Sequence, residues 1–296
     1  MFVVLGAVLL LGSLAFGYVV WIRPHESRLD LNTKAVMLLV LLTLAGAFWG
    51  AVPWWQDENE KTFSWDLPPL ASRMLGAAAI AFVPAGVIAL ARPTPSNLRL
   101  QLVMLVVYLA PLVLAIAALH LDYFDFSRPI VWAFFGISGG MSLAALYFLF
   151  VSPELSLAED ASPATQSPYL RVWLVAVAAL MVVWGLALFI TDDGGQKDIW
   201  VWPGDALASK LIGVMLLTIA ASCIYALLRP GATFMALVLT AVYGIAGALA
   251  NYWQTFLDKP TKDGYIVVLG IIGLVSLALL AARAVVPDKA PADAAT

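Results

Sequence analysis

Nine apolar segments of this chain are each long enough to cross a lipid bilayer. They lie near residues 2–22, 35–53, 70–91, 99–119, 129–151, 169–190, 206–228, 231–250 and 264–284. A helix of about 20 apolar residues crosses a hydrocarbon core of about 30 Å, and 62% of this chain is hydrophobic and only 12% charged. We therefore predict an all-α integral membrane protein with nine transmembrane helices.

The chain also repeats its own sequence. The pattern Trp-x4-Leu-Ala-Ser-[Arg/Lys]-x2-Gly occurs at 65–76 and again at 202–213, a separation of 137 residues. Trp49-Gly50 recurs after 135 residues, and a Gly and Ser pattern at 136–144 recurs after 134. Self-similarity of this kind indicates a tandem duplication. Four spans per unit is an even number, so we expect two parallel repeats related by an axis along the membrane normal.

This repeat divides the chain into five parts. The N-terminal transmembrane helix with its cytoplasmic loop covers 1–34 and lacks the basic start of a secretory signal, so we expect it to be retained. The two four-helix repeats cover 35–151 and 169–286. A cytoplasmic linker, 152–168, joins them, and the polar tail 287–296 has the composition of a disordered segment.

The basic residues next to the first span indicate the orientation. Arg23, Arg28 and Lys34 follow that span directly, and such clusters favour the cytoplasmic side. The N-terminus then lies outside, and an odd number of spans puts the C-terminus in the cytoplasm. Short loops without Asn-x-Ser/Thr acceptor sites suit a bacterial inner (cytoplasmic) membrane.

Several classes of function are disfavoured by what the sequence lacks. The net charge of −3 comes without a basic cluster, so nucleic acid is not an expected partner. The single cysteine, Cys223, gives neither a disulfide framework nor a thiol-based metal site. No phosphate loop, dinucleotide fingerprint, zinc-protease helix or nucleophile elbow is present. The deep parts of the spans carry no Asp, Glu, Lys or Arg, which ion-coupled transporters require.

Two cations stand at unfavourable positions. Arg73 and Lys210 each occupy the first turn of a predicted helix on the outer side, where both the helix dipole and the charge bias of loops oppose them. One interpretation is that they reach lipid phosphates or pair with Asp66 and Asp205. The other is that they grip one anionic ligand as a pair.

The residues around these cations complete a candidate ligand or lipid site. Ser72 and Ser209 precede the cations, and each shares a helix face with a glycine four residues later, which leaves room for a close neighbour. In the ligand interpretation Trp65 and Trp202 stack against the bound molecule. The predicted site is therefore Arg73, Lys210, Ser72, Ser209, Trp65 and Trp202.

A second candidate surface follows from the aromatic residues of the outer loops. It consists of His120, Asn251, Tyr123 and Trp253, and it could receive a partner subunit, a lipid or a hydrophobic cofactor. His120 is the one candidate ligand for a haem or related pigment, with Asn251 in a roughly corresponding place in the second unit. The ordinary alternatives are an interfacial aromatic belt and a polar helix end.

From these features we expect a non-catalytic membrane subunit. It would scaffold or stabilise a larger complex, with membrane lipids and other membrane subunits as partners and lipid or pigment bound at its outer face. The alternative is a transporter or flippase-like carrier of an amphipathic, anionic small molecule or lipid. A third class, a membrane enzyme acting on lipid, would need clustered acid, base or nucleophile groups, for which Asp66, Asp205 and His120 are the only material.

Overall fold

All regular structure in the described part of the chain is helical. The computed structural model describes residues 2–58, 64–65, 67–152, 154–155, 157, 166–191, 206–257, 259 and 263–285. Its nine long helices are α1 Phe2–Gly17, α2 Leu31–Trp55, α3 Pro69–Ala91, α4 Pro95–Leu119, α5 Pro129–Leu146, α6 Pro168–Ile190, α7 Ala206–Leu228, α8 Thr233–Trp253 and α9 Asp263–Val285. Nine spans in this part are long and apolar enough to cross a membrane, which confirms the expected number.

Short helical turns extend several of the long helices. A π-helical turn, Tyr18–Ile22, and a 3-10 segment, Arg23–Arg28, continue α1, and the π turn Tyr147–Val151 continues α5. Three helices begin at capping side chains, which accept hydrogen bonds from backbone N–H groups of the first turn. Asp30 accepts from Thr33 at 2.8 Å, Thr94 from Asn97 at 3.2 Å and Ser167 from Leu170 at 3.4 Å.

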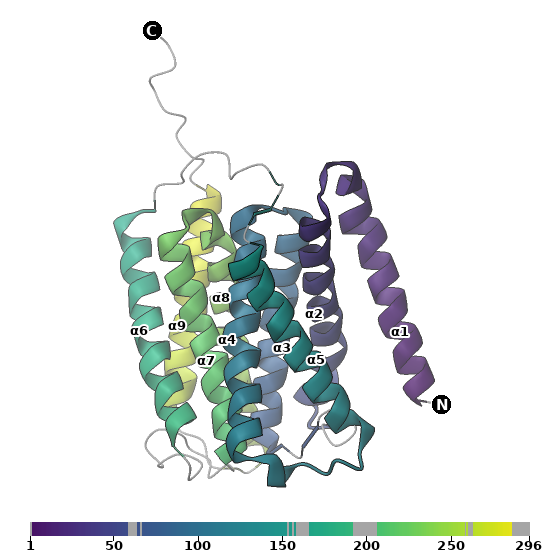
Figure 1. Cartoon of the computed structure of the whole chain (residues 1–296). Coiled ribbons are helices and arrows are strands. Elements are labelled where there is room, and N and C mark those ends of the chain that lie inside the picture. The colour runs from purple at the N-terminus through teal and green to yellow at the C-terminus, as the bar shows by residue number, and fades with distance from the viewer. Residues whose placement is uncertain are drawn as a thin grey trace.

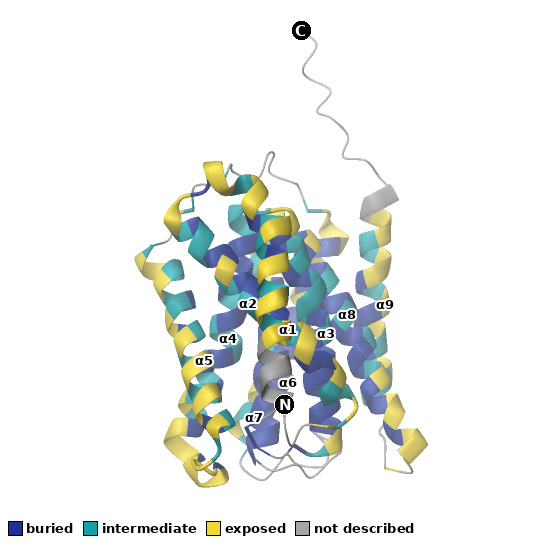
Figure 2. Ribbon diagram, turned by 90° about the vertical axis from the view of Figure 1, so that its right-hand side faces the viewer, coloured by how far each residue is buried: buried dark blue, intermediate teal, exposed yellow. Residues whose placement is uncertain are grey.

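The helices run alternately up and down in one bundle, with the two chain ends at opposite ends of it (Figure 1). We call the end where α3, α5, α7 and α9 begin the lower end. At the centre, α3 packs against α8 and α4 packs against α7. Next to these, α2 covers α3, α6 covers α7, α5 lies on α4 and α9 on α8, while α1 contacts α2. Buried residues are concentrated in the central helices, whereas α1 is largely exposed (Figure 2).

Glycines let three pairs of helices approach closely. A Cβ atom at Gly76 of α3 would lie 2.9 Å from the backbone nitrogen of Trp55 in α2. A Cβ at Gly213 of α7 would lie 2.8 Å from the carbonyl oxygen of Gly185 in α6, and Gly244 and Gly273 bring α8 against α9 in the same way. Small residues are the usual means of close helix contact in membranes. The expected close neighbours of the Gly76 and Gly213 faces are thereby confirmed as α2 and α6.

Candidate functional site

The two cations of the predicted site are buried inside the protein at its lower end. Arg73 is 6% exposed and Lys210 is 2% exposed. The Nη1 atom of Arg73 donates a 3.2 Å hydrogen bond to the carbonyl oxygen of Pro69, and its Nε has no hydrogen-bond partner. Asp57, just beyond α2, attracts the guanidinium electrostatically. Asp66 and Asp205, the partners considered from the sequence, lie outside the described residues.

The two cations are turned toward different sides of the bundle. Arg73 precedes Gly76 by three residues, and Lys210 precedes Gly213 by three, so each cation lies about 60° around its helix from that glycine. Gly76 faces α2 and Gly213 faces α6. Because α2 and α6 lie on opposite sides of the bundle (Figure 1), the register directs the two side chains to separate flanks.

The two serines of the predicted site are both buried but differ in their bonding. The hydroxyl of Ser72 donates a 2.8 Å hydrogen bond to the carbonyl oxygen of Trp54, which fixes the end of α2 against the start of α3. The hydroxyl of Ser209 has no hydrogen-bond partner. Equivalent sequence positions therefore do different work in the two halves.

The predicted tryptophans could be located for one half only. Trp65 is 4% exposed, and its ring lies edge-on to Phe124 at 5.4 Å and to Phe134 at 5.5 Å between centroids. It therefore packs the loop before α3 against the loop before α5 and against α5 itself. Trp202 lies outside the described residues.

The second candidate surface is partly buried and partly exposed. His120 is 8% exposed, its ring lies edge-on to Tyr123 at 5.5 Å, and its Nε2 has no hydrogen-bond partner. Tyr123 and Trp253 are 43% and 46% exposed. Asn251 is buried and donates to the carbonyl oxygen of Gly247 at 2.8 Å and to Met74 Sδ at 3.7 Å, so it joins α8 to α3. No group of three metal-binding side chains occurs among the described residues.

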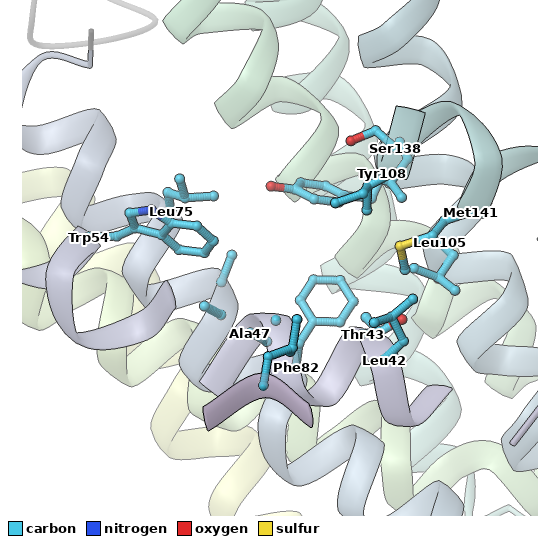
Figure 3. Close-up of a pocket in the computed structure, with 16 residues that line it drawn as sticks. Leu42, Thr43, Ala47, Trp54, Leu75, Phe82, Leu105, Tyr108, Ser138 and Met141 are labelled. Carbon is cyan, nitrogen blue, oxygen red and sulfur yellow. The ribbon is translucent and has the colours of Figure 1, made fainter. Parts of the chain in front are cut away.

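A cavity that sequence reasoning missed lies between α2, α3, α4 and α5, with α1 at its edge (Figure 3). Its volume is about 260 Å³. Along α2 it extends from Leu42 to Trp54, twelve residues or roughly 18 Å of helix. Its shape therefore follows the helix axes within the depth of the expected membrane.

The walls of this cavity are almost entirely apolar. Among its sixteen described lining residues there is no Asp, Glu, His, Lys, Arg or Cys. The few polar side chains include Thr43, whose hydroxyl already donates to the carbonyl oxygen of Leu39, and Tyr108, whose hydroxyl points into the open space (Figure 3). Such walls suit a hydrocarbon chain and offer no acid or base for catalysis.

Comparisons of this chain with protein-family models, with curated proteins and with solved structures found no match. Its function is therefore inferred from its own residues and their geometry. The strongest geometric feature is the cavity, since its open space is visible at a single residue. A Cβ atom added at Gly46 would meet no atom within 4 Å.

The sequence does carry a trace of the cavity in its small lining residues. Gly46, Ala78, Ala79 and Ser138 all lie on its walls. Small residues at helical spacing more often mark close helix contacts, as they do at Gly76 and Gly213. Only the position of the neighbouring helices distinguishes a contact from a gap.

Proposed function

We propose that this protein is a non-catalytic membrane subunit that holds one apolar or amphipathic lipid-like molecule in the cavity between α2 and α5. The observation that carries the proposal is an apolar space of about 260 Å³ at membrane depth. Pockets that bind ligands are concave and mostly apolar, with a few placed polar groups. The cavity has this character, and its position suits a molecule that arrives from the bilayer.

The tandem four-helix repeat, which we also propose, gives an independent reason to regard the cavity as a binding site. At the repeat separations of 135, 137 and 134 residues, Gly46, Ala78 and Ser138 correspond to Met181, Met215 and Ile272. These three larger side chains are buried. The second unit thus fills the space that the first unit leaves open, so an empty cavity is not a requirement of the shared helix arrangement.

The chemistry of the walls defines the class of ligand. A charged group inside this cavity would lose its hydration without gaining a counter-ion, so the enclosed part of the ligand is uncharged. The Tyr108 hydroxyl can donate to a neutral acceptor such as an ester, ketone or quinone carbonyl oxygen. Gly46 and Ile137 are exposed at the cavity edge, which gives a chain access from the lipid phase.

Substitution of Gly46 tests this proposal directly. Gly46→Met copies the proposed counterpart Met181 and places a side chain in the cavity without a clash at its Cβ. Gly270→Met on α9 is the matched control, because its Cβ also meets nothing within 4 Å and Gly270 does not line the cavity. The protein is extracted in a mild detergent, and bound molecules are measured by native mass spectrometry, lipid extraction and absorbance.

We expect the original chain and Gly270→Met to retain one apolar molecule per protein, and Gly46→Met to lose it. Retention of the same molecule by Gly46→Met, or its absence from the original chain, contradicts the proposal. Native electrophoresis of the same extract tests the accessory role. Co-migration with defined membrane subunits supports it, and a band containing this chain alone opposes it.

The proposed location is a bacterial inner membrane with the lower end outside and the C-terminus in the cytoplasm. Its support is the cluster Arg23, Arg28 and Lys34 at the opposite end. Single cysteines at Ser127 and at Ser27, two exposed positions at opposite ends, test the orientation. A membrane-impermeant maleimide applied to intact cells should label Ser127→Cys and spare Ser27→Cys; the reverse pattern refutes this orientation.

A carrier of an amphipathic anion is the second candidate, supported by the buried Arg73 and Lys210 at one end of the bundle. Since the two cations face different flanks, such a carrier would bind anions at two separate places. The double variant Arg73→Ala and Lys210→Ala should then remain folded and lose substrate binding. Normal transport by that variant rules the carrier out in this form.

A further inference from the structure

A second hollow lies on the other side of the α2 and α3 pair. It is a groove of about 620 Å³ between Phe48 and Val52 of α2 and Ile80 and Val83 of α3. Ile80 lies about 160° around α3 from Ala78, which lines the cavity described above, because successive residues turn by about 100°. The groove and the cavity therefore open on different faces of the protein, and they are independent of each other.

Arg73 stands at the lower end of the groove. It precedes Ile80 by seven residues, which is close to two helical turns, so the two residues share one face of α3 about 10 Å apart along its axis. The hydrogen bond from Arg73 Nη1 to the carbonyl oxygen of Pro69 draws the guanidinium further toward the lower end. The face thus changes from apolar at mid-helix to cationic at the membrane boundary.

The guanidinium has donor capacity that the protein does not use. Arg73 is 6% exposed, its Nε has no hydrogen-bond partner, and the one hydrogen bond recorded for it uses Nη1 alone of its three nitrogens. A buried donor without a partner is costly, and more so when it is charged. Asp57 offsets part of this charge from a distance but does not provide the missing acceptor.

We propose that this groove binds an anionic phospholipid, with one acyl chain along Ile80 and Val83 and the phosphate oxygens accepting hydrogen bonds from Arg73. Arginine pairs well with phosphate because its planar donors match the oxygens in two-point contacts. The groove walls include Phe48 and Val52, which are 55% and 60% exposed and apolar. A lipid satisfies both halves of this surface, whereas a free anion satisfies only the cation.

The experiment measures lipid binding to the purified full-length chain in detergent. Phosphatidylglycerol and phosphatidylcholine with identical acyl chains are titrated separately, and bound lipid is counted by native mass spectrometry. Inorganic phosphate is added in a third series as a competitor. We expect the anionic lipid to bind at least about tenfold more tightly than the zwitterionic one, as a single charged hydrogen bond allows, and inorganic phosphate to compete poorly.

Four variants assign that preference to the groove. Arg73→Gln should remove the preference and Arg73→Lys should keep most of it, while Arg128→Gln, the same charge change at the same end of the bundle, should leave it intact. Val83→Trp, which fills the groove, should weaken binding of both lipids, and Val87→Trp, outside the groove, should not.

One more variant keeps the test decisive if Arg73→Gln does not fold. Asp57→Asn removes the competing carboxylate, and asparagine tolerates the positive φ of 66° at this position. It should strengthen binding of the anionic lipid severalfold. Equal binding of the two lipids by the original chain, equal competition by inorganic phosphate, or no effect of Asp57→Asn would overturn the proposal. None of these results depends on occupancy of the α2 to α5 cavity.

Discussion

The indole Nε1 of Trp173 donates a 3.0 Å hydrogen bond to the hydroxyl oxygen of Ser276, and this contact connects α6 with α9. The rings of Trp184 and Tyr265 stack between the same two helices with their centroids 5.3 Å apart. In the first half, the position that matches Ser276 is Ser142, which donates to the carbonyl oxygen of Ser138 within its own helix. There α2 and α5 stand on opposite walls of the cavity, so one half is closed by side chains and the other is open.

Removal of the Trp173 donor should destabilise the closed half. Trp173→Phe keeps an aromatic ring and loses the hydrogen bond to Ser276, so we expect unfolding to become easier by about 1 kcal/mol, within the range for interhelical hydrogen bonds in membranes. Thermal unfolding in detergent measures the change. Ser142→Ala, which removes only a bond within α5, is the control and should change stability less. Equal effects of the two variants would show that the contact across the helices contributes nothing of its own.

Alanine at Gly213 should disturb the contact of α7 with α6. The added Cβ would lie 2.8 Å from the carbonyl oxygen of Gly185, a backbone atom that cannot move aside alone. We expect a loss of about 1–3 kcal/mol, the usual cost of overpacking. Gly140→Ala in α5 meets nothing within 4 Å and should be neutral or slightly stabilising, since alanine favours helix. Chemical denaturation in detergent compares the two, and similar stabilities would contradict the close approach.

Serine-to-alanine changes should differ between the two halves. Ser72→Ala removes the hydrogen bond to the carbonyl oxygen of Trp54 and should cost about 1 kcal/mol. Ser209→Ala removes a buried hydroxyl that has no partner, so it should be neutral or stabilising. Parallel thermal unfolding of the two variants is the measurement. A larger loss at Ser209 than at Ser72 would refute this assignment of the bonds.

The loop between α4 and α5 should show a local response to pH at Asp125. Hydrogen bonds from the Ser127 side chain and backbone lower the pKa of the Asp125 carboxyl below its ordinary value of about 3.9. A lowered folded-state pKa contributes stability that is complete above the ordinary pKa and is lost as the pH falls through the lowered one. Ser127→Ala should raise the pKa of Asp125, and Ser127→Thr should not. Carboxyl NMR titration of Asp125 measures both, and an unchanged pKa in Ser127→Ala would rule out the side-chain bond.

The expected spans agree with the helices because the bilayer imposes the same length on each of them. The segment expected near 206–228 is α7, Ala206–Leu228, and the segment near 70–91 is α3, Pro69–Ala91. The glycine faces were predictable for a similar reason, since close helix contact in lipid requires small residues. The predicted grouping of Arg73 with Lys210 remains untested, and the register directs the two to different flanks.

The amino-acid sequence by itself determined the number and length of the helices, because these depend only on apolar character along the chain and on bilayer thickness. It also determined which glycines could lie at contacts. Only the tertiary structure decided that the small residues around Gly46 border open space while those at Gly213 touch a neighbouring backbone. The physical reason is that a gap depends on where other helices stand, and that position is set by packing over the whole bundle rather than by any single segment.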